Sequence, residues 1–258
     1  EELKDDYPNV KIGQWFLDPL NKKGPDFSRN KERILDKINV VDSTFLTTSP
    51  TALNFLPRDK NIHYIPNPSD KSFEILNNYE SSCNVDVFFA LSHGVHRGVL
   101  KSGKTDDRVN FVNHLMNITP DVKFDIYGLN NVQPIWADHY FKTISNAKMG
   151  LNLSRGEAIK YYSSDRITQI IGNGLVCLIE EKTEYKNFFN DKEMVFYKNA
   201  SDLSEKISKI SNDDKLRKMI AKNGKKKYMK FFNSNLVAQF IIDKTLDLKT
   251  KNKFLWEK

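Results

Sequence analysis

The stretch MGLNLSRGEAIKYYSSDRITQIIGNGLVCLIEE, residues 149–181, decides the fold of this chain. It holds an apolar run from Met149 to Leu153, a polar loop, a helix that opens near Ser164, a Gly-Asn-Gly stop and a second apolar run from Leu175 to Ile179. Both runs are nearly continuous and lack polar alternation, which is typical of parallel strands that helices cover on both faces. The stretch therefore predicts a strand-loop-helix-strand unit.

The loop between the first strand and the helix is the expected ligand site. Ligands of open parallel sheets bind beyond the carboxyl ends of the strands, and here that place is residues 154–164. The loop leads into a helix N-terminus, whose free backbone N–H groups attract anions. We therefore expect an anionic ligand at this loop, which carries Arg155, Glu157, Lys160, Tyr161 and Tyr162 and leads to Ser163, Ser164 and Arg166 at the start of the helix.

The segments around this unit continue the alternation of strands and helices. The expected strands are 85–91, 122–127 and 194–197, and the expected helices are 106–117, 135–146, 184–189, 200–210, 213–232 and 235–248. Such alternation with short connections is typical of a doubly wound parallel sheet. We predict an α/β, Rossmann-like domain over residues 85–232.

A shorter α/β series precedes that domain. Its expected strands are 10–16, 40–46 and 62–65, its expected helix is 30–38, and a further helix begins at Ser49-Pro50. These strands are too few for a complete doubly wound sheet, so we expect residues 1–70 to be the remainder of an incomplete first domain. The polar segment 71–84, which follows the break Pro66-Asn67-Pro68, is the predicted linker.

Composition narrows the class of protein. The 258 residues are 39% hydrophobic and 28% charged, as in ordinary globular domains, and apolar runs are far shorter than the roughly 20 residues of a membrane helix. The start, EELKDDYP, lacks a signal pattern and an initiating Met, so a trimmed longer protein is expected. Only Cys83 and Cys177 are present, which favours the cytoplasm. The net charge of +7 indicates an anionic partner or simply favours solubility.

Residues 98–105, GVLKSGKT, match the GxxxxGK[ST] phosphate loop, in which Lys104 would reach the outer phosphates and Thr105 a metal. Six residues separate the end of the expected strand from the first glycine, whereas a true phosphate loop follows its strand almost directly. A P-loop NTPase or kinase is therefore the alternative function. In either case a basic loop with His93, Arg97 and Lys104 joins a strand to a helix and is placed to bind phosphate.

Several other chemistries lack their signatures. The chain has no G-x-S-x-G, no G-x-G-x-x-G and no Asp-x-Asp. His93 and His96 have HxxH spacing without a second ligand cluster, so no metal site is expected. If a diphosphate binds, cations and helix N-termini must neutralise it.

Residues 165–176, DRITQIIGNGLV, resemble the R-x-F-E-x-x-A-x-G-x-x-[VL] segment of group 1, CgeB-like glycosyltransferases of the GT-B architecture. The resemblance extends loosely over residues 85–232, and Gly13 to Asp18 is similar to the W-F-x-D strand of that family's first half. It implies transfer of a hexose from a nucleotide-diphosphate sugar to a glycan or lipid-linked hydroxyl acceptor at the cell surface, without metal or cofactor. It also implies that residues 233–258 cross back to the first domain.

The resemblance assigns roles to single positions. Arg166 falls on the family's Arg, and Gln169 falls where the family usually has a Glu that binds the ribose hydroxyls. A neutral amide there forfeits a charge-assisted hydrogen bond. With the base expected near Tyr127 and Gly128, the implied donor pocket comprises His93, Arg97, Lys104, Tyr127, Gly128, Ser154, Tyr162, Ser163, Ser164, Arg166 and Gln169.

The general base is not settled by the sequence. If the reaction inverts, the base must face the cleft from the first domain, and Asp18 and His63 are the candidates there. Glu157 is a third candidate carboxylate. It is also the only support for a nucleotide-sugar epimerase of the same fold, which is a further alternative.

Lysines alternate with aromatic residues near the end of the chain. Five lysines between Lys222 and Lys230, with Tyr228, Phe231 and Phe232, could contact anionic lipid at the inner face of the membrane, at about 1 kcal/mol for each lysine. An exposed helix face with its aromatic residues packed inward is the simpler interpretation. No nucleic-acid motif is present, so no nucleic-acid partner is expected.

Overall fold

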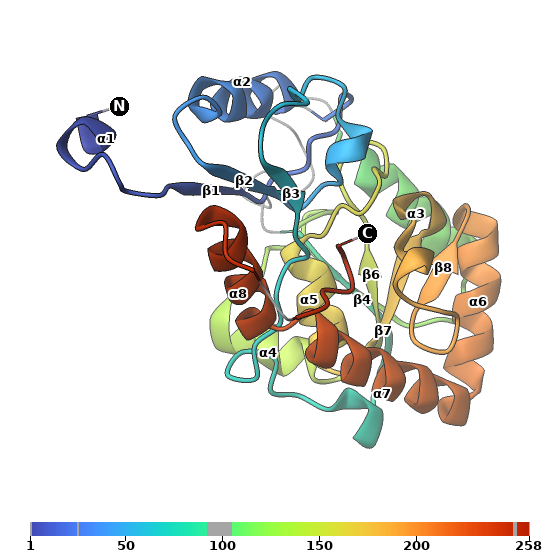
Figure 1. The fold of residues 1–258 in the computed structure, drawn as a ribbon. Coiled ribbons are helices and arrows are strands. Elements are labelled where there is room, and N and C mark those ends of the chain that lie inside the picture. Colours follow the sequence, from blue (N-terminus) through green and yellow to red (C-terminus); the bar gives the residue numbers. More distant parts are fainter. Residues whose placement is uncertain (1, 25, 92–104, 250–251, 258) are drawn as a thin grey trace.

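The structure is a computed structural model that describes residues 2–24, 26–91, 105–249 and 252–257. It contains two sheets in which all strand pairs are parallel, one near each end of the molecule in Figure 1. The α/β class with Rossmann-like parallel sheets is confirmed. None of the helices in these residues has the length and apolarity that a bilayer crossing requires.

The first sheet has three strands in the order β1-β2-β3. Its strands are β1 (Gly13–Phe16), β2 (Ser43–Leu46) and β3 (Ile62–Tyr64). Helix α2 (Phe27–Lys37) buries Ile34 against Leu46 and Leu53 in a small core of its own. The remaining elements of this part are α1 (Glu2–Asp6) and a single 3-10 turn, η1 (Pro50–Ala52), which begins where a helix was expected to begin.

The second sheet has five strands in the order β5-β4-β6-β7-β8. Its strands are β4 (Val85–Ala90), β5 (Phe124–Tyr127), β6 (Ala147–Asn152), β7 (Val176–Glu180) and β8 (Val195–Tyr197). The helices are α3 (Asp107–Ile118), α4 (Ala137–Ile144), α5 (Asp165–Gly172), α6 (Ala200–Asn212) and α7 (Asp214–Phe231). The predicted strand-loop-helix-strand unit is β6-α5-β7, with β6 and β7 in parallel register.

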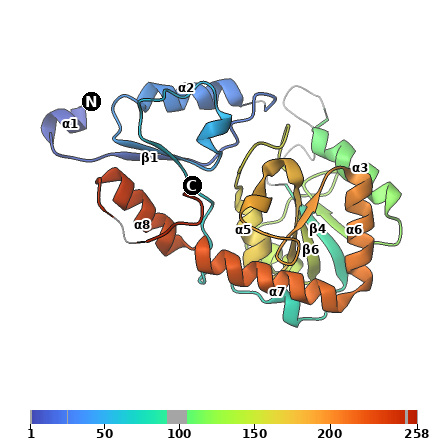
Figure 2. The same cartoon turned by 45° about the vertical axis from the view of Figure 1, so that its right-hand side comes forward.

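Helices cover both faces of this sheet, as the apolar strands require. Along β7, Cys177 and Ile179 point to the core that contains α5, whereas Val176 and Leu178 point to the core that contains α3 and α6. Both faces of the strand are therefore buried, which is why its sequence shows no polar alternation. Figure 2 shows the layers, with α6 on one side and α5 on the other.

The last helix, α8 (Ser234–Thr245), packs on the first sheet although it follows α7 of the second (Figure 2). Phe240 lies with its ring centroid 6.3 Å from that of Phe45 on β2, and Ser43 Oγ donates to the Lys244 carbonyl at 3.0 Å. Phe254 and Trp256 pack against Phe240. The division of the chain into residues 1–70, 71–84, 85–232 and 233–258 stays a prediction.

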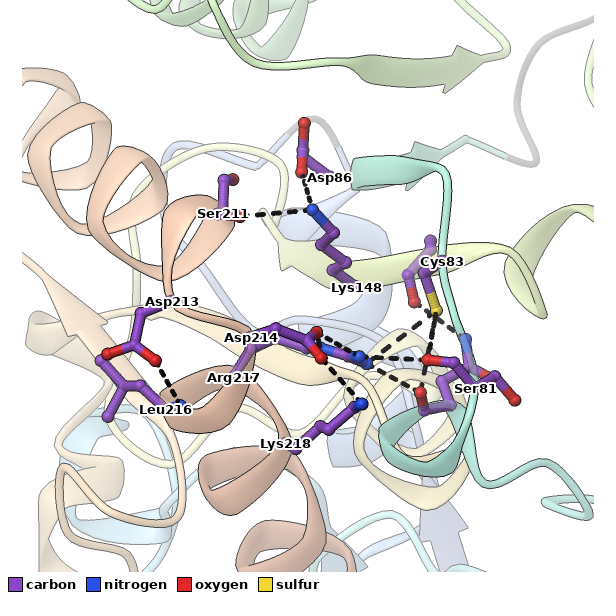
Figure 3. Close-up of polar contacts among 12 residues, drawn as sticks. Ser81, Cys83, Asp86, Lys148, Ser211, Asp213, Asp214, Leu216, Arg217 and Lys218 are labelled. Carbon is purple, nitrogen blue, oxygen red and sulfur yellow. Dashed lines mark hydrogen bonds and ion pairs between the residues drawn. The ribbon is translucent and has the colours of Figure 1, made fainter.

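The connecting segment 71–84 is fastened to the second sheet's helices. It contains one 3-10 turn, η2 (Asn78–Glu80), and the fully buried guanidinium of Arg217 on α7 donates to the carbonyls of Asn78 at 2.7 Å and Ser81 at 3.1 Å. The same side chain pairs with Asp214 at 2.6 Å (Figure 3). A segment with the composition of a loose linker is thus held in one position.

One expected helix is wrong. Residues 184–189 form no α-helix; two 3-10 turns, η4 (Glu181–Thr183) and η5 (Tyr185–Asn187), occupy this region. Glu184 between them has a φ of 57°, in the left-handed region, which interrupts a right-handed helix. Apolar spacing alone did not reveal that interruption.

Candidate functional site

A cleft of about 940 Å³ is lined by both parts of the molecule. The first part contributes the segment after β1 and the start of α2, and the second contributes the strand ends of the larger sheet together with α4 and α5. This volume is in the range of small-molecule sites. The residues that the argument uses are Asp18, Asn30, Glu74, Arg108, Tyr140, Ser154, Arg155, Tyr162, Ser164, Arg166 and Gln169.

The cleft lies at the point where the strand order of the larger sheet reverses. From β4 the chain goes outward to β5 and then returns to β6 on the other side of β4, so the carboxyl ends of β4 and β6 flank the switch point. Doubly wound sheets bind their ligands there. The turn after β5 is compact because Gly128 has a φ of +80°, and a Cβ on it would lie 2.2 Å from the Leu91 carbonyl oxygen.

Arg166, on the first turn of α5, is held at this switch point by the backbone. Its Nε donates to the carbonyl of Ala90 at 3.4 Å, and its Nη1 donates to that of Leu153 at 3.2 Å. The guanidinium also lies 5.3 Å from the ring centroid of Phe89. The side chain is therefore fixed between the ends of the two central strands.

The charge of Arg166 is not neutralised within the described part of the chain. No carboxylate there lies within ion-pair distance of its guanidinium, and residues 92–104 include no Asp or Glu. Burial lowers the pKa of Arg166, and the nearby charge of Arg108 lowers it further. A partly buried cation without a counter-ion is a site that favours an anionic ligand.

Two further arginines share one carboxylate on the same wall. Arg108 forms a two-point contact with Asp106, with Nε and Nη2 donating at 2.9 and 2.8 Å, and Arg155 Nε lies 3.7 Å from the same carboxylate. Burial acts to raise the pKa of Asp106, and the hydrogen bonds and charge of Arg108 outweigh it and leave this pKa low. Three arginines against the carboxylates of Asp106 and of Asp165, the neighbour of Arg166 on α5, leave this wall with a net positive charge.

The N-terminus of α5 is built by side chains from both parts. Ser164 lines the cleft and its hydroxyl donates to Asn152 Oδ1 at 2.9 Å. Ser163 is fully buried and accepts the Asn67 backbone N–H at 2.8 Å. Tyr162 lines the cleft, and burial raises its pKa. Ser163 therefore supports the helix end, while Ser164 and Tyr162 face the ligand space.

Gln169 lies on α5 one turn beyond Arg166 and also lines the cleft. Its Oε1 accepts the hydroxyl proton of Tyr140 at 2.7 Å. This hydrogen bond fixes the carboxamide, and its Nε2 has no hydrogen-bond partner among the described residues. The amide is thus oriented with a free donor.

The structure separates the three candidate bases. Asp18 lines the cleft from the first part, close enough to Tyr162 to influence its ionisation. His63 lies outside the cleft lining, stacked on Phe45 with α8 beside it, and burial lowers its pKa to about 4. Glu157 also lies outside, paired with the Lys23 ammonium at 2.5 Å on the surface.

Other predicted donor residues lie elsewhere. Tyr127 and Gly128 do not line the cleft; Tyr127 packs against Phe88 and His139. Ser154 does line it. His93, Arg97 and Lys104, with most of the 98–105 motif, fall outside the described residues.

The sequence reading left some lining residues out of the site. Asn30 on α2 is almost fully buried, and its Oδ1 has no partner among the described residues. Trp136 is 59% exposed at the edge of the cleft. Glu74 also lines the cleft, although it belongs to the segment predicted as the linker. No local pattern marks these residues, because their shared position depends on how the two parts pack.

Comparison with known proteins decides the family. The family described as "Glycosyl transferase-like" matches residues 108–243, more than half of the chain. The chain belongs to the glycosyl transferase-like family. The match contains α5 with Arg166 and Gln169, and thus most of the second-sheet wall of the cleft. No curated protein sequence gives a significant match.

Solved structures similar to this glycosyl transferase-like chain share its fold. TarM has a TM-score of 0.66 at 14% identity over 93% of this chain and 51% of its own. An S. aureus TarM variant in complex with Fondaparinux, alpha-GlcNAc-glycerol and UDP has a TM-score of 0.64 and 13% identity, and the match covers 98% of this chain and 52% of the variant. HepE from Anabaena in complex with UDP-glucose has a TM-score of 0.64 and 11% identity, and the match covers 95% of this chain and 75% of HepE. The GT-B fold is thereby shown, and the chain spans about half of the length of TarM.

The lysine-rich face of this glycosyl transferase-like chain is partly engaged by protein groups. Lys225 Nζ donates to the Leu76 carbonyl at 2.6 Å, and Lys227 pairs with Glu193 at 2.7 Å. Tyr228 and Phe232 are fully buried. The inward packing of these two aromatic residues leaves the proposed lipid contact without support.

Proposed function

We propose that this chain binds a nucleotide-diphosphate sugar of the UDP class on the second-sheet wall and transfers the sugar to a hydroxyl acceptor at the first-sheet wall. The observation that carries the proposal is Arg166, a fixed cation at the switch point of the sheet that forms no ion pair with any described residue. The family match supports glycosyl transfer, and neither the P-loop nor the epimerase alternative is favoured by it.

The wall chemistry suits departure of a nucleoside diphosphate. When the bond to the sugar breaks, negative charge develops on the diphosphate, and pre-placed cations at that position stabilise it. Arg166 supplies one such cation, and Arg108 and Arg155 lie on the same wall. Metal independence is part of this proposal, since the guanidinium groups take the role that a divalent cation would otherwise have.

The acceptor side is proposed on the opposite wall. Asp18 lies there with a carboxylate, and Asn30 with an Oδ1 that has no hydrogen-bond partner among the described residues; such oxygen atoms accept hydrogen bonds from sugar hydroxyls. The complexes of HepE with UDP-glucose and of the TarM variant with alpha-GlcNAc-glycerol support a hexosyl donor and a glycan or lipid-linked acceptor. Membership of the group 1, CgeB-like branch, a role in cell-surface synthesis and a cytoplasmic location belong to the same proposal.

Calorimetric titration with UDP tests the donor site. We expect UDP to bind in the presence of EDTA, with ADP and ATP binding more weakly. Arg166→Ala should weaken UDP binding strongly, while Arg58→Ala, which removes an exposed arginine away from the cleft, should leave it unchanged. Binding only to ATP with magnesium, indifferent to Arg166→Ala, would contradict the proposal and favour the P-loop alternative.

A further inference from the structure

Glu74 is a carboxylate that the connecting segment places inside the cleft. Its residue is 8% exposed, while its neighbours Phe73 and Ile75 are 68% and 62% exposed, so the chain turns the acid inward and the apolar groups outward. This reverses the usual preference of charged and apolar side chains. The burial of this carboxylate therefore calls for a structural or functional explanation.

The carboxylate of Glu74 is only partly satisfied by the protein. Oε2 accepts the Asp70 backbone N–H at 2.6 Å, and no described residue gives Oε1 a hydrogen bond. The nearby Lys225 ammonium donates to the Glu74 backbone carbonyl at 3.4 Å instead of to the carboxylate. Lys225 acts on the carboxylate only at a distance. A buried carboxylate without a direct ion pair is unfavourable by itself, because burial penalises charge that is not paired.

The segment holds Glu74 against the end of α5. A Cβ built on Gly172 would lie 2.3 Å from Glu74 Cγ, so only glycine leaves room for this side chain. Leu76 N donates to Asn173 Oδ1 at 3.1 Å, which ties the segment to the same helix end. Gln169 precedes Gly172 by three residues, and side chains at that spacing share a helix face with their Cβ atoms about 5–6 Å apart.

Glu74 and Gln169 together offer a free acceptor beside a free donor. Tyr140 occupies Gln169 Oε1, which leaves the Nε2 protons for a ligand. The negative charge of Glu74 contributes to the raised pKa of Tyr140, after burial and against the effect of Arg166, so these groups share one neighbourhood. An acceptor next to a donor matches the two hydroxyls of a vicinal diol, each of which can both donate and accept.

The position of this pair along α5 selects the ribose of the nucleotide. Gln169 is three residues from Arg166, about 4.5 Å along the helix axis. With the diphosphate on Arg166, the next chemical group of the nucleotide is its ribose. We propose that Glu74 and Gln169 together bind the ribose diol, so that the segment joining the two parts contributes to recognition of the donor nucleotide. The inference rests on the proposed function.

Titration with UDP and with 2′,3′-dideoxy-UDP tests the inference. Glu74→Gln keeps an acceptor for the Asp70 N–H and removes the charge. We expect it to weaken UDP about tenfold and to leave dideoxy-UDP within twofold, because only UDP presents the diol. Glu80→Gln, an exposed acid in the same segment, is the matched control and should change neither.

A second test moves the negative charge from position 74 to position 169. The double variant Glu74→Gln with Gln169→Glu returns one carboxylate to the pair, keeps the acceptor for Tyr140 and should recover most of the UDP affinity lost in Glu74→Gln. Gly172→Ala should weaken UDP as Glu74→Gln does, and should add little in the Glu74→Gln background if both changes act on the same contact.

The outcomes separate this inference from the proposed function. If UDP and dideoxy-UDP bind but Glu74→Gln weakens both equally, or if the double variant recovers nothing, Glu74 acts only in the structure and the inference is wrong while the donor site stands. If neither nucleotide binds the unmodified chain, the proposed function fails and the inference fails with it.

Discussion

The two walls of the cleft differ in charge and in the way their groups are held. The second-sheet wall presents arginines that backbone carbonyls and one carboxylate fix in place. The first-sheet wall presents Asp18 and Asn30, whose Oδ1 has no hydrogen-bond partner in the part of the chain that the structure describes. A fixed positive wall suits a ligand of constant charge. A wall of acid and amide suits neutral hydroxyls. The difference indicates that donor and acceptor are recognised by separate physical means.

Removing a positive charge from the second-sheet wall should have the largest effect on ligand affinity. Arg166→Ala removes the central cation, and hydrogen bonds to charged groups contribute about 1.5–3 kcal/mol each, so UDP affinity should fall about 100-fold in calorimetry. Arg166→Lys should recover part of the loss, since it keeps the charge and loses the planar fork. Equal affinity in Arg166→Ala would place the diphosphate elsewhere.

Removing the carboxylate of the first-sheet wall should change the use of the acceptor and leave donor affinity unchanged. Asp18→Asn should lower kcat/KM for the acceptor about tenfold in a transfer assay, because a neutral amide replaces a charged hydrogen-bond acceptor. UDP affinity should stay within twofold. Asp36→Asn, an exposed acid on α2 outside the cleft, is the control. A parallel loss of UDP affinity in Asp18→Asn would mean that the walls do not divide the ligands.

His63 serves as a contrast to Asp18, because it lies on the first sheet but does not line the cleft. Burial, with a smaller effect from Lys244, lowers its pKa from 6.5 to about 4. The folded protein therefore holds it neutral, while the unfolded chain protonates it near pH 6.5, so stability is lost as pH falls from 6.5 toward 4. His63→Phe should reduce the fall in Tm between pH 7 and pH 4.5 by a few degrees, with UDP affinity unchanged.

The smallest expected effect is that of Glu74 on the stability of the unliganded protein, which is separate from its proposed part in UDP binding. Burial raises its pKa above 4.5, with Asp70 adding to the rise and the Asp70 N–H and Lys225 opposing it. Ionisation thus costs the folded state free energy above that pKa and nothing well below 4.5. Glu74→Gln should raise Tm slightly at pH 7 and leave it unchanged at pH 3, where the carboxyl is protonated in both states. A lower Tm at pH 7 would show that the carboxylate stabilises the fold.

Much of the fold follows from local sequence, and less of the site does. The apolar runs and the Gly-Asn-Gly stop within residues 149–181 predicted β6, α5 and β7, because period and helix stops are local properties. Ser164 and Arg166 followed from their place at the helix start. The assignment of individual residues to the donor site stays a prediction.

The unpredicted features depend on tertiary packing. The resemblance implies that residues 233–258 return to the first domain, but the strand residues Ile62 to Tyr64 do not reveal that α8 covers His63, because α8 lies far along the chain. The polar composition of residues 71–84 indicates a linker, whereas hydrogen bonds from Arg217 and to Asn173 hold that segment in the wall of the cleft. Local patterns give elements, and contacts between distant elements decide which side chains meet.

The acceptors that hold Arg166 are main-chain carbonyls, those of Ala90 and Leu153. Substitution of either side chain leaves its carbonyl in place, so the anchor of the proposed phosphate site is insensitive to mutation at those two positions. The loop residues 156–161, which lie between Arg155 and Tyr162, can then vary without loss of that anchor. On the proposed function, a directed-evolution library confined to this loop would explore sugar preference while retaining the nucleotide.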